Sequence, residues 1–337
     1  MRIEPWDPDD ETTARGCYEV HRAANAVDEP DEPPMGAGTF GIFLREGFEK
    51  SPGEVWIAAD AECGVAGFFR MALPDLENLD RAYSGPAVHP AMRRRGIGSE
   101  LLRHEAGRAA ANGRKILSAV TLAGSAGEVF AKAVGGVLGI EEVRRVQHLA
   151  KIQAAQLTSL REAAVGAAAG YSLVSWTGDT PDKYLDPLAK VINAFEDAPH
   201  APGVQPGVWD GARLRERTGA IVRAGFLRAY GVAAIQDATG EMAAFTGVIV
   251  DPESPEWGFQ ELTAVTRPHR GHRLGLLVKT AMLELLAQAE PQLERIQTGN
   301  AAANDHMIAV NEQLGYEVAE PAWLVYDLPV DKISGTA

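Results

Sequence analysis

The apolar residues of the first half of the chain alternate between strand-like and helix-like spacing. Short runs rich in β-branched residues predict strands, and apolar residues three or four positions apart predict helices. The predicted strands are Arg2–Trp6, Glu54–Ala59, Gly64–Met71, Arg81–Val88, Lys115–Leu122 and Val143–Ile152. The predicted helices are Asp10–Ala26, Thr39–Lys50, Gly98–Asn112 and Ala126–Leu138, with a loop rich in Asp, Glu and Pro at Val27–Gly38.

The second half repeats this order after an alanine-rich segment that predicts a connecting helix. Its predicted strands are Ser172–Thr177, Phe226–Gln236, Glu241–Val250, Gln260–Val265, Arg295–Thr298 and Tyr316–Leu328. Its predicted helices are Leu185–Phe195, Asp210–Ala224, Gly275–Gln288 and Ala303–Leu314, with a Pro- and Gly-rich loop at Ala198–Gly207. Each half is therefore an α/β or α+β unit. We expect one domain at residues 1–152, a linker at 153–170 and a second domain at 171–331.

A segment rich in glycine and arginine occurs twice, 177 residues apart, each time between a predicted strand and a predicted helix. The first copy has a complete Arg-x-x-Gly-x-Gly pattern at Arg93–Gly98, whereas Arg273 replaces the middle glycine in the second. A strand, a tight turn and a helix start present unpaired backbone N–H groups to an anion. The repeat therefore predicts two related phosphate sites. Neither copy has the Walker or the dinucleotide-binding pattern.

Composition narrows the possible partners. The net charge of −14 argues against nucleic-acid binding and makes the local arginine clusters candidates for an anionic ligand. No apolar run reaches the roughly 18 residues needed to cross a membrane, and the N-terminus lacks a signal-peptide pattern. Cys17 and Cys63 are too few for a disulfide framework or a zinc cluster. We expect a cytoplasmic protein without a metal site.

With these motifs, the chain resembles the GNAT superfamily of acyltransferases. The segment Val-x4-Arg-x-x-Gly-x-Gly is similar to that superfamily's acetyl-CoA pyrophosphate loop, and Thr298–Tyr316 is similar to its later strand and helix. The two-copy order resembles the actinobacterial tandem GNAT proteins, a group that includes mycothiol synthase. The resemblance implies two tandem GNAT-like domains, each a mixed, mostly antiparallel sheet flanked by helices. It further implies acetyl-CoA as cofactor and acetyl transfer to a small-molecule amine by a monomer or homodimer.

The same resemblance implies a set of cofactor-binding residues in the two loops and the later helix. They are Val88, Arg93, Arg94, Arg95, Gly96, Ile97, Gly98, Val265, Arg270, Gly271, His272, Arg273, Leu274, Gly275 and Asn304. His269 and His272 lie among arginines, which makes a metal site there improbable.

The second half has the more suitable polar residues for acetyl transfer, which needs a proton acceptor for the attacking amine and a donor for the leaving thiolate. Glu261 is the candidate base, and Thr263, two residues on, is predicted to share its face of the strand. The 177-residue offset aligns Ser84 with Glu261, so the first half has no carboxylate on that strand. We therefore expect catalysis in the second half.

Three further assignments complete the predicted site. Asn311 stands where many GNAT enzymes have a tyrosine that acts as general acid; it can hydrogen-bond the sulfur but cannot give up a proton. The acid is then absent, a water molecule or Tyr316. Glu196 and Asp197 are candidates for holding a cationic substrate. Two other interpretations stay open: a CoA-binding sensor or regulator without transfer activity, and an interaction protein that uses the fold as a scaffold. The segment Ala123–Gly127 around Ser125 loosely resembles a hydrolase nucleophile turn, but a small-residue turn explains it better.

Overall fold

The fold was analysed in a computed structural model. It describes residues 1–47, 50, 52–60, 64–195, 202–217, 222–301 and 305–334. The chain forms two compact units. The N-terminal unit contains Met1–Glu141, Ala201–Gln205 and Pro321–Ala337, and the C-terminal unit contains Glu142–His200 and Pro206–Glu320. The units are therefore not the contiguous ranges expected from the sequence.

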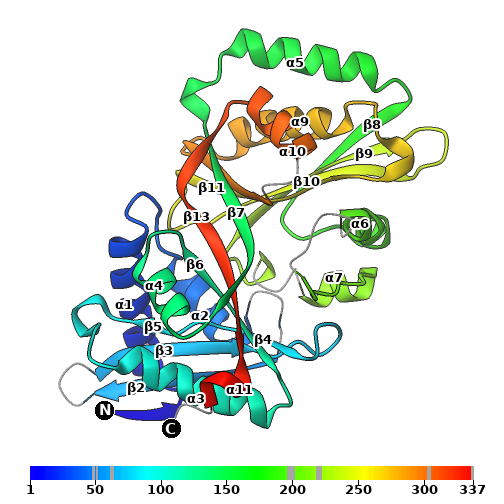
Figure 1. Ribbon diagram of the computed structural model, residues 1–337. Helices are drawn as coiled ribbons and strands as arrows, with labels where there is room; N and C mark the ends of the chain where they lie inside the picture. The colour runs from blue at the N-terminus through cyan, green and yellow to red at the C-terminus, as the bar shows by residue number, and fades with distance from the viewer. Residues whose placement is uncertain are drawn as a thin grey trace. The chain divides into compact units, whose positions relative to one another are not determined.

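The N-terminal unit is a sheet with helices on both faces (Figure 1). Its strands are β1 (Arg2–Pro5), β2 (Gly53–Asp60), β3 (Gly64–Ala72), β4 (Arg81–Tyr83), β5 (Ala87–Val88) and β6 (Ile116–Leu122). Its helices are α1 (Glu11–Asp28), α2 (Ala37–Glu46), η1 (Pro90–Met92), α3 (Ile97–Ala111), α4 (Ala126–Ala133) and α11 (Val330–Ser334). Helices α1 and α2 pack on one face through Cys17, Val20 and Phe40, and α3 and α11 pack on the other.

The C-terminal unit has the same plan. Its strands are β8 (Tyr171–Thr177), β9 (Arg228–Gln236), β10 (Met242–Val250), β11 (Trp257–Val265) and β12 (Arg295–Ala301). Its helices are η2 (Leu149–Lys151), α5 (Ala154–Ala167), α6 (Asp182–Phe195), α7 (Gly211–Arg217), η3 (Arg267–His269), α9 (Leu274–Ala289) and α10 (Asp305–Gln313). Helices α5, α9 and α10 cover one face of the sheet, and α6 and α7 cover the other.

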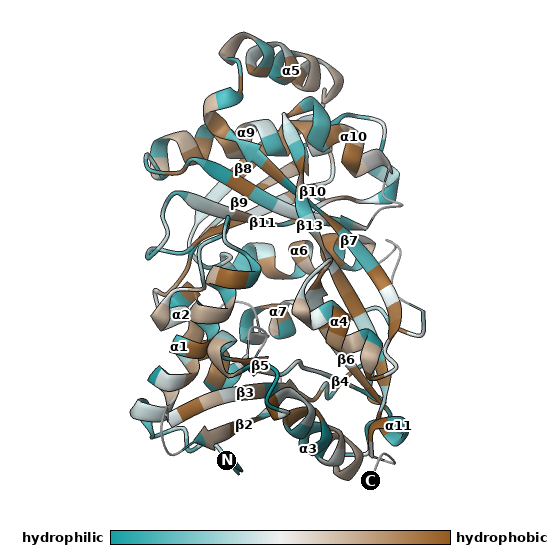
Figure 2. Cartoon of the chain, turned by 60° about the vertical axis from the view of Figure 1, so that its left-hand side comes forward, coloured by the Kyte–Doolittle hydropathy of each residue, from teal (hydrophilic) through white to brown (hydrophobic). Residues whose placement is uncertain are grey.

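Each sheet is completed by a strand from the other half of the chain. Strand β13 (Tyr316–Pro329) leaves the C-terminal unit and pairs antiparallel with β6 through Trp323–Pro329. Strand β7 (Val137–His148) leaves the N-terminal unit and pairs antiparallel with β12 through Glu142–His148. In Figure 2, apolar residues recur along β3 and β13. Phe69 of β3 and Leu324 and Leu328 of β13 lie in one core cluster.

Most predicted elements are present, with shifted ends. The predicted strand Arg81–Val88 is interrupted and forms β4 and β5. Helix α4 ends at Ala133 because Gly135 takes a left-handed conformation (φ 82°), so β7 begins at Val137 and not at Val143. The buried Cys17 is a free thiol, and Cys63 lies outside the described residues. Among the described helices, none is both long and apolar enough to cross a membrane.

Candidate active site

The two glycine–arginine loops have the same backbone hydrogen bonds at positions 177 residues apart. In each loop the strand bonds back to its neighbour, and the turn closes on itself. The bonds of the first loop are His89 N to Ala66 O (3.0 Å), Met92 N to His89 O (2.8 Å) and Glu100 N to Gly96 O (3.0 Å). Those of the second are Thr266 N to Ala243 O (2.9 Å), His269 N to Thr266 O (3.0 Å) and Leu277 N to Arg273 O (3.0 Å). The repeat seen in the sequence is therefore a repeat of backbone geometry.

Each loop places two residues in the left-handed region, two positions apart. They are Arg94 (φ 64°) and Gly96 (φ 83°) in the first loop, and Gly271 (φ 90°) and Arg273 (φ 52°) in the second. Each loop thus uses one glycine and one arginine, in opposite order. The replacement of the middle glycine by Arg273 does not change the turn, since Arg273 takes the left-handed conformation itself.

The first turn of the following helix is the anion-binding end of each loop. The first N–H groups of α3 and α9 have no acceptor within their helix. A Cβ added to Gly98 would lie 3.8 Å from Val88 Cγ2, and one added to Gly275 would lie 3.8 Å from Val265 Cγ2. The same valine therefore packs on the same glycine in both loops, and the helix start lies close to the strand end.

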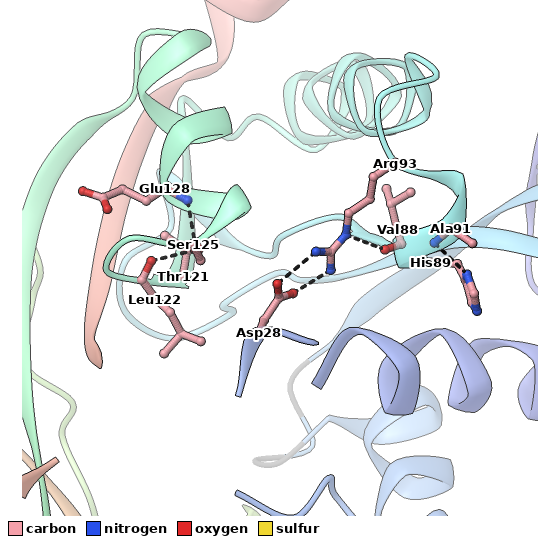
Figure 3. A network of polar contacts seen from close by, with 9 residues as sticks. All are labelled: Asp28, Val88, His89, Ala91, Arg93, Thr121, Leu122, Ser125 and Glu128. Carbon is pink, nitrogen blue, oxygen red and sulfur yellow. Dashed lines mark hydrogen bonds and ion pairs between the residues drawn. The ribbon is translucent and has the colours of Figure 1, made fainter. Parts of the chain in front are cut away.

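The loop arginines have different roles. Arg93 Nε donates to Val88 O at 3.2 Å, and the guanidinium binds both carboxylate oxygens of Asp28 at 2.9 and 2.6 Å (Figure 3). Arg270 Nε makes the equivalent bond to Val265 O at 3.3 Å. Arg93 thus holds α1 against the loop, and its charge is balanced by Asp28. The exposed arginines of the two loops are Arg94, Arg95, Arg267, Arg270 and Arg273.

His269 and His272 both contact the side chain of Tyr171. Tyr171 Oη lies 2.8 Å from His269 Nδ1, and the Tyr171 ring lies 5.5 Å from that of the exposed His272. Glu241 lies 3.5 Å from His269 Nε2. In the described part of the chain, no group of three His, Cys, Asp or Glu residues is placed to hold a metal ion. These contacts fix the second loop to β8.

In each unit two parallel strands part behind the loop. Strands β11 and β12 pair only at Trp257–Phe259 with Arg295–Gln297. Further along, β11 stays with β10 and β12 stays with β7, apart from a weak contact between Thr298 Oγ1 and Gln260 O at 3.4 Å. Strands β4 and β6 likewise pair only at Arg81–Tyr83 with Ile116–Ser118. The parted edges leave backbone N–H and C=O groups that a bound chain can use.

Glu261 is the extra residue of a β-bulge in β11. Across the pair, Gly247 faces Leu262 and Val248 faces Gln260, so no residue of β10 faces Glu261. The 177-residue offset fails here: Phe259 to Val265 is one residue longer than Tyr83 to Val88, although their partners on β10 and β3 are equally spaced. The predicted alignment of Ser84 with Glu261 is therefore wrong, because the bulge is absent from the N-terminal unit.

The bulge also separates Glu261 from Thr263. Thr263 Oγ1 lies 2.7 Å from Thr246 Oγ1, whereas a Cβ added to Gly247, the next residue of β10, would lie 3.6 Å from Glu261 Oε2. Since successive strand residues point to opposite faces, Glu261 and Thr263 lie on opposite faces of the sheet. The prediction that they share a face is wrong. Glu261 lies on the face that α6 and α7 cover.

The carboxyl of Glu261 is accessible and yet partly desolvated. By solvent-accessible surface Glu261 is an exposed residue, so water reaches its side chain. The protein atoms around it nevertheless raise the pKa of this carboxyl to about 7. A carboxylate with such a pKa is suited to accept a proton near neutral pH.

Asn311 and Tyr316 are both buried, 1% and 5% exposed. Asn311 Oδ1 accepts a hydrogen bond from Lys279 Nζ at 2.8 Å, and Asn311 Nδ2 donates to Asn300 Oδ1 at 2.9 Å. Burial raises the pKa of the Tyr316 phenol above its usual value, which makes it a weaker acid. Lys279 and Asn300 were missed in the sequence, where a single lysine inside the apolar run of α9 was the available signal.

Three predicted site residues, Glu196, Asp197 and Asn304, lie outside the described residues.

Ser125 has a structural role at the start of α4. Its hydroxyl donates to Leu122 O at 2.7 Å and caps α4 by accepting from Glu128 N at 3.2 Å (Figure 3). It is a helix cap and not a nucleophile.

In the N-terminal unit, α3 supplies a carboxyl, that of Glu105, near the separated strands β4 and β6. Burial raises the pKa of Glu105 to about 8, and the Ser84 hydroxyl lowers it only in part. The Ser84–Glu105 contact is a poor one, since neither Ser84 Oγ nor Glu105 Oε1 has a hydrogen-bond partner of good geometry in the described part of the chain. Glu105 is 1% exposed, so it is less accessible than Glu261.

Each unit thus combines a glycine–arginine loop, two parallel strands that separate and a later helix. Residues 16–129 match the sequence model of the acetyltransferase (GNAT) family. The chain carries a GNAT acetyltransferase domain. The matched GNAT segment contains the loop with the complete Arg-x-x-Gly-x-Gly pattern. No curated protein matches the chain in sequence.

Solved structures extend the GNAT likeness over both units. A tandem GNAT protein from the clavulanic acid biosynthesis pathway is 29% identical, with a TM-score of 0.79 over 98% of each chain. A GCN5-related N-acetyltransferase from Sphaerobacter thermophilus has a TM-score of 0.67 at 12% identity, covering 98% of this chain and 95% of its own. A glucosamine N-acetyltransferase region of a fungal β-N-acetylglucosaminidase has a TM-score of 0.63 at 12% identity, covering 97% and 38%. The predicted tandem GNAT fold is confirmed.

Proposed function

We propose that the protein is an acetyl-CoA-dependent N-acetyltransferase that acts on the amine of a small molecule, with catalysis in the C-terminal unit. The observation that carries the proposal is the position of Glu261. It is an accessible carboxyl on the bulge of β11, beside the parting of β11 and β12, with a pKa raised to about 7.

The cofactor would be held by its two polar parts. The N–H groups at the start of α9 and the exposed Arg270 and Arg273 suit a pyrophosphate. The parted edges of β11 and β12 suit an extended chain with amide groups, such as the pantetheine arm. Loop and strand edges of the same kind in the N-terminal unit support CoA binding there as well.

The reaction requires only groups that these elements supply. An ammonium must lose a proton before its nitrogen can attack the thioester, and Glu261 accepts that proton once it is ionised. The net charge of −14 does not oppose the approach of a cationic amine. We place the reaction in the cytoplasm, in line with the free thiol of Cys17, and assign no metal or nucleic acid to it.

A pH profile of the Glu261→Gln variant tests the proposal. Wild-type kcat/KM for acetyl transfer to a panel of small amines should rise with pH through about 7, because the base works when ionised. The variant should lose this rise and about 100-fold in kcat/KM at pH 8. Glu294→Gln, an exposed carboxylate just before β12, is the matched control and should behave as wild type.

The outcomes separate the alternatives. An unchanged rate and profile in Glu261→Gln would remove Glu261 as the base while leaving transfer intact. Absence of transfer to every amine, with CoA still bound, would support a CoA-binding sensor instead.

A further inference from the structure

Lys279 is a buried cation on α9. It is 3% exposed and follows Leu276, Leu277 and Val278 in the sequence. Burial lowers the pKa of its ammonium to about 7, and no carboxylate of the described residues contributes to the shift. A buried ammonium without an ion-pair partner is costly, so it is retained in a packed core only where something offsets that cost.

The contacts of Lys279 fix the orientation of Asn311. Lys279 Nζ donates to Asn311 Oδ1, 2.8 Å away, so the amide oxygen of Asn311 is turned toward the lysine. The Asn311 nitrogen then points to Asn300 Oδ1 at 2.9 Å, and no other residue that the structure describes accepts its second N–H. The Tyr316 ring, with its centroid 4.7 Å from Lys279 Nζ, lies against the cation.

The N-terminal unit shows that the fold does not need this chain of polar side chains. Helices α3 and α9 align with the 177-residue offset of their loops, which places Leu102 at the position of Lys279. The turns after α4 and α10 align through Gly135 and Gly315, which places Ala131 at the position of Asn311. Leu102 and Ala131 are 4% and 8% exposed and lie in an apolar core cluster.

The polar chain ends where the strands have parted. Asn300 lies on β12 beyond Gln297, the last residue of β12 that pairs with β11. Lys279, Asn311 and Asn300 thus connect the interior of α9, through α10, to the strand edge that borders the proposed thioester site. Asn300 therefore lies on the part of β12 that has separated from β11, the strand that carries Glu261.

We propose that Lys279 is a positioning residue for the leaving group: through its bond to Asn311 it holds an amide N–H ready for the sulfur of the acyl donor. This inference rests on the proposed function. In the step, the amine nitrogen forms a bond to the thioester carbonyl carbon, the C–S bond breaks, and its electron pair moves to sulfur. The proton from the amine passes to Glu261, and the thiolate accepts the hydrogen bond from Asn311 Nδ2.

The test compares two acyl donors with the same CoA body, acetyl-CoA and its selenoester analogue. A selenolate is the weaker base, so it needs less stabilisation as it leaves. Lys279→Leu copies the residue found at Leu102, and Lys279→Arg keeps the charge. With acetyl-CoA, Lys279→Leu should lower kcat on the order of 100-fold with little change in KM. With the selenoester the loss should be several-fold smaller, and Lys279→Arg should restore part of the rate.

Stability and a neighbouring variant control for a structural role. Lys279→Leu should still unfold cooperatively near the wild-type temperature, because the packed leucine replaces a buried ammonium and so offsets the loss of the donor to Asn311 Oδ1. Thr280→Val removes the next buried polar side chain of α9, which bonds only to Leu277 O at 3.0 Å, and should keep wild-type kcat with both donors. An equal loss of kcat with both donors, an effect on KM alone, or no effect would overturn the inference. A wild type that transfers from neither donor would instead refute the proposed function.

Discussion

Arg273 shows how a residue that breaks a motif can keep its geometry. The second loop lacks the middle glycine of the first, and the structure shows Arg273 in the left-handed conformation that Gly96 takes in the first loop. A non-glycine residue in this region costs about 1–2 kcal/mol, and glycine regains only part of this because of its greater freedom when unfolded.

Replacing this arginine tests the strain. Arg273→Gly should raise the free energy of unfolding by up to about 1 kcal/mol in urea denaturation, because the left-handed conformation no longer carries a Cβ. Gly271→Ala, at φ 90°, should lower it by about 1 kcal/mol or more. A destabilised Arg273→Gly would show that the side chain of Arg273 contributes more than its backbone costs.

At the scale of residues, the sequence could identify some members of the candidate site but not their orientation or contacts. Glu261 could be named because the family resemblance puts the strand before the loop beside the thioester and Glu261 is the carboxylate of that strand. Its face could not be predicted, because a bulge leaves no mark in the sequence. The hydrogen bonds of Asn311 depend on Lys279 and Asn300, which lie 32 and 11 residues away and on other elements. Spacing along one element carries no information about such contacts.

At the scale of elements, the strands and helices could be predicted because apolar spacing determines them locally. Helix ends were predicted less well where a left-handed glycine stops the helix, as at Gly135. The exchange of β7 and β13 could not be predicted, since each strand reads as the last strand of its own half and pairing partners far along the chain are not encoded in spacing.

Substitutions at the first turns of α3 and α9 test whether the two loops bind CoA. Gly98 and Gly275 have no positive φ, and a Cβ on either would meet its nearest neighbour at 3.8 Å, so a side chain fits there. A glutamate at either position should repel pyrophosphate without unfolding the protein. In calorimetric titration with CoA, Gly98→Glu should remove one binding event and keep transfer, and Gly275→Glu should remove the other and abolish transfer.

The double variant decides whether the loops bind phosphate at all. Unchanged CoA affinity in Gly98→Glu/Gly275→Glu would refute the phosphate-binding role of both loops. Loss of transfer in Gly98→Glu alone would move catalysis to the N-terminal unit.

At the scale of the whole molecule, the exchanged strands make the two halves of the chain dependent on each other. The segment after Pro321 contributes several side chains to the core of the N-terminal unit: Leu324, Tyr326, Leu328, Val330 and Ile333, each 3–8% exposed. Burial of such side chains contributes about 1.5–3 kcal/mol each. Their sum is comparable to the total stability of about 5–15 kcal/mol for a typical domain.

A truncation tests this dependence. Residues 1–152 alone should fail to give a cooperative unfolding transition by circular dichroism, because the sheet lacks its β13 strand and α11. Residues 1–141 joined by a flexible linker to residues 316–334 should recover one. Cooperative unfolding of 1–152 on its own would show that the exchanged strand is dispensable.

The exchanged strand β13 also delays the folding of the N-terminal unit during synthesis of the chain. Chains emerge from the ribosome N-terminus first, and most domains can fold as soon as their own residues have appeared. Here the sheet of the first unit waits for Trp323–Pro329, which are translated long after the β6 strand that they pair with. The first half must therefore stay incomplete, with one side of β6 open, while nearly two hundred further residues are made. A stop codon or a stalled ribosome before Trp323 would thus leave the sheet of the N-terminal unit without this strand.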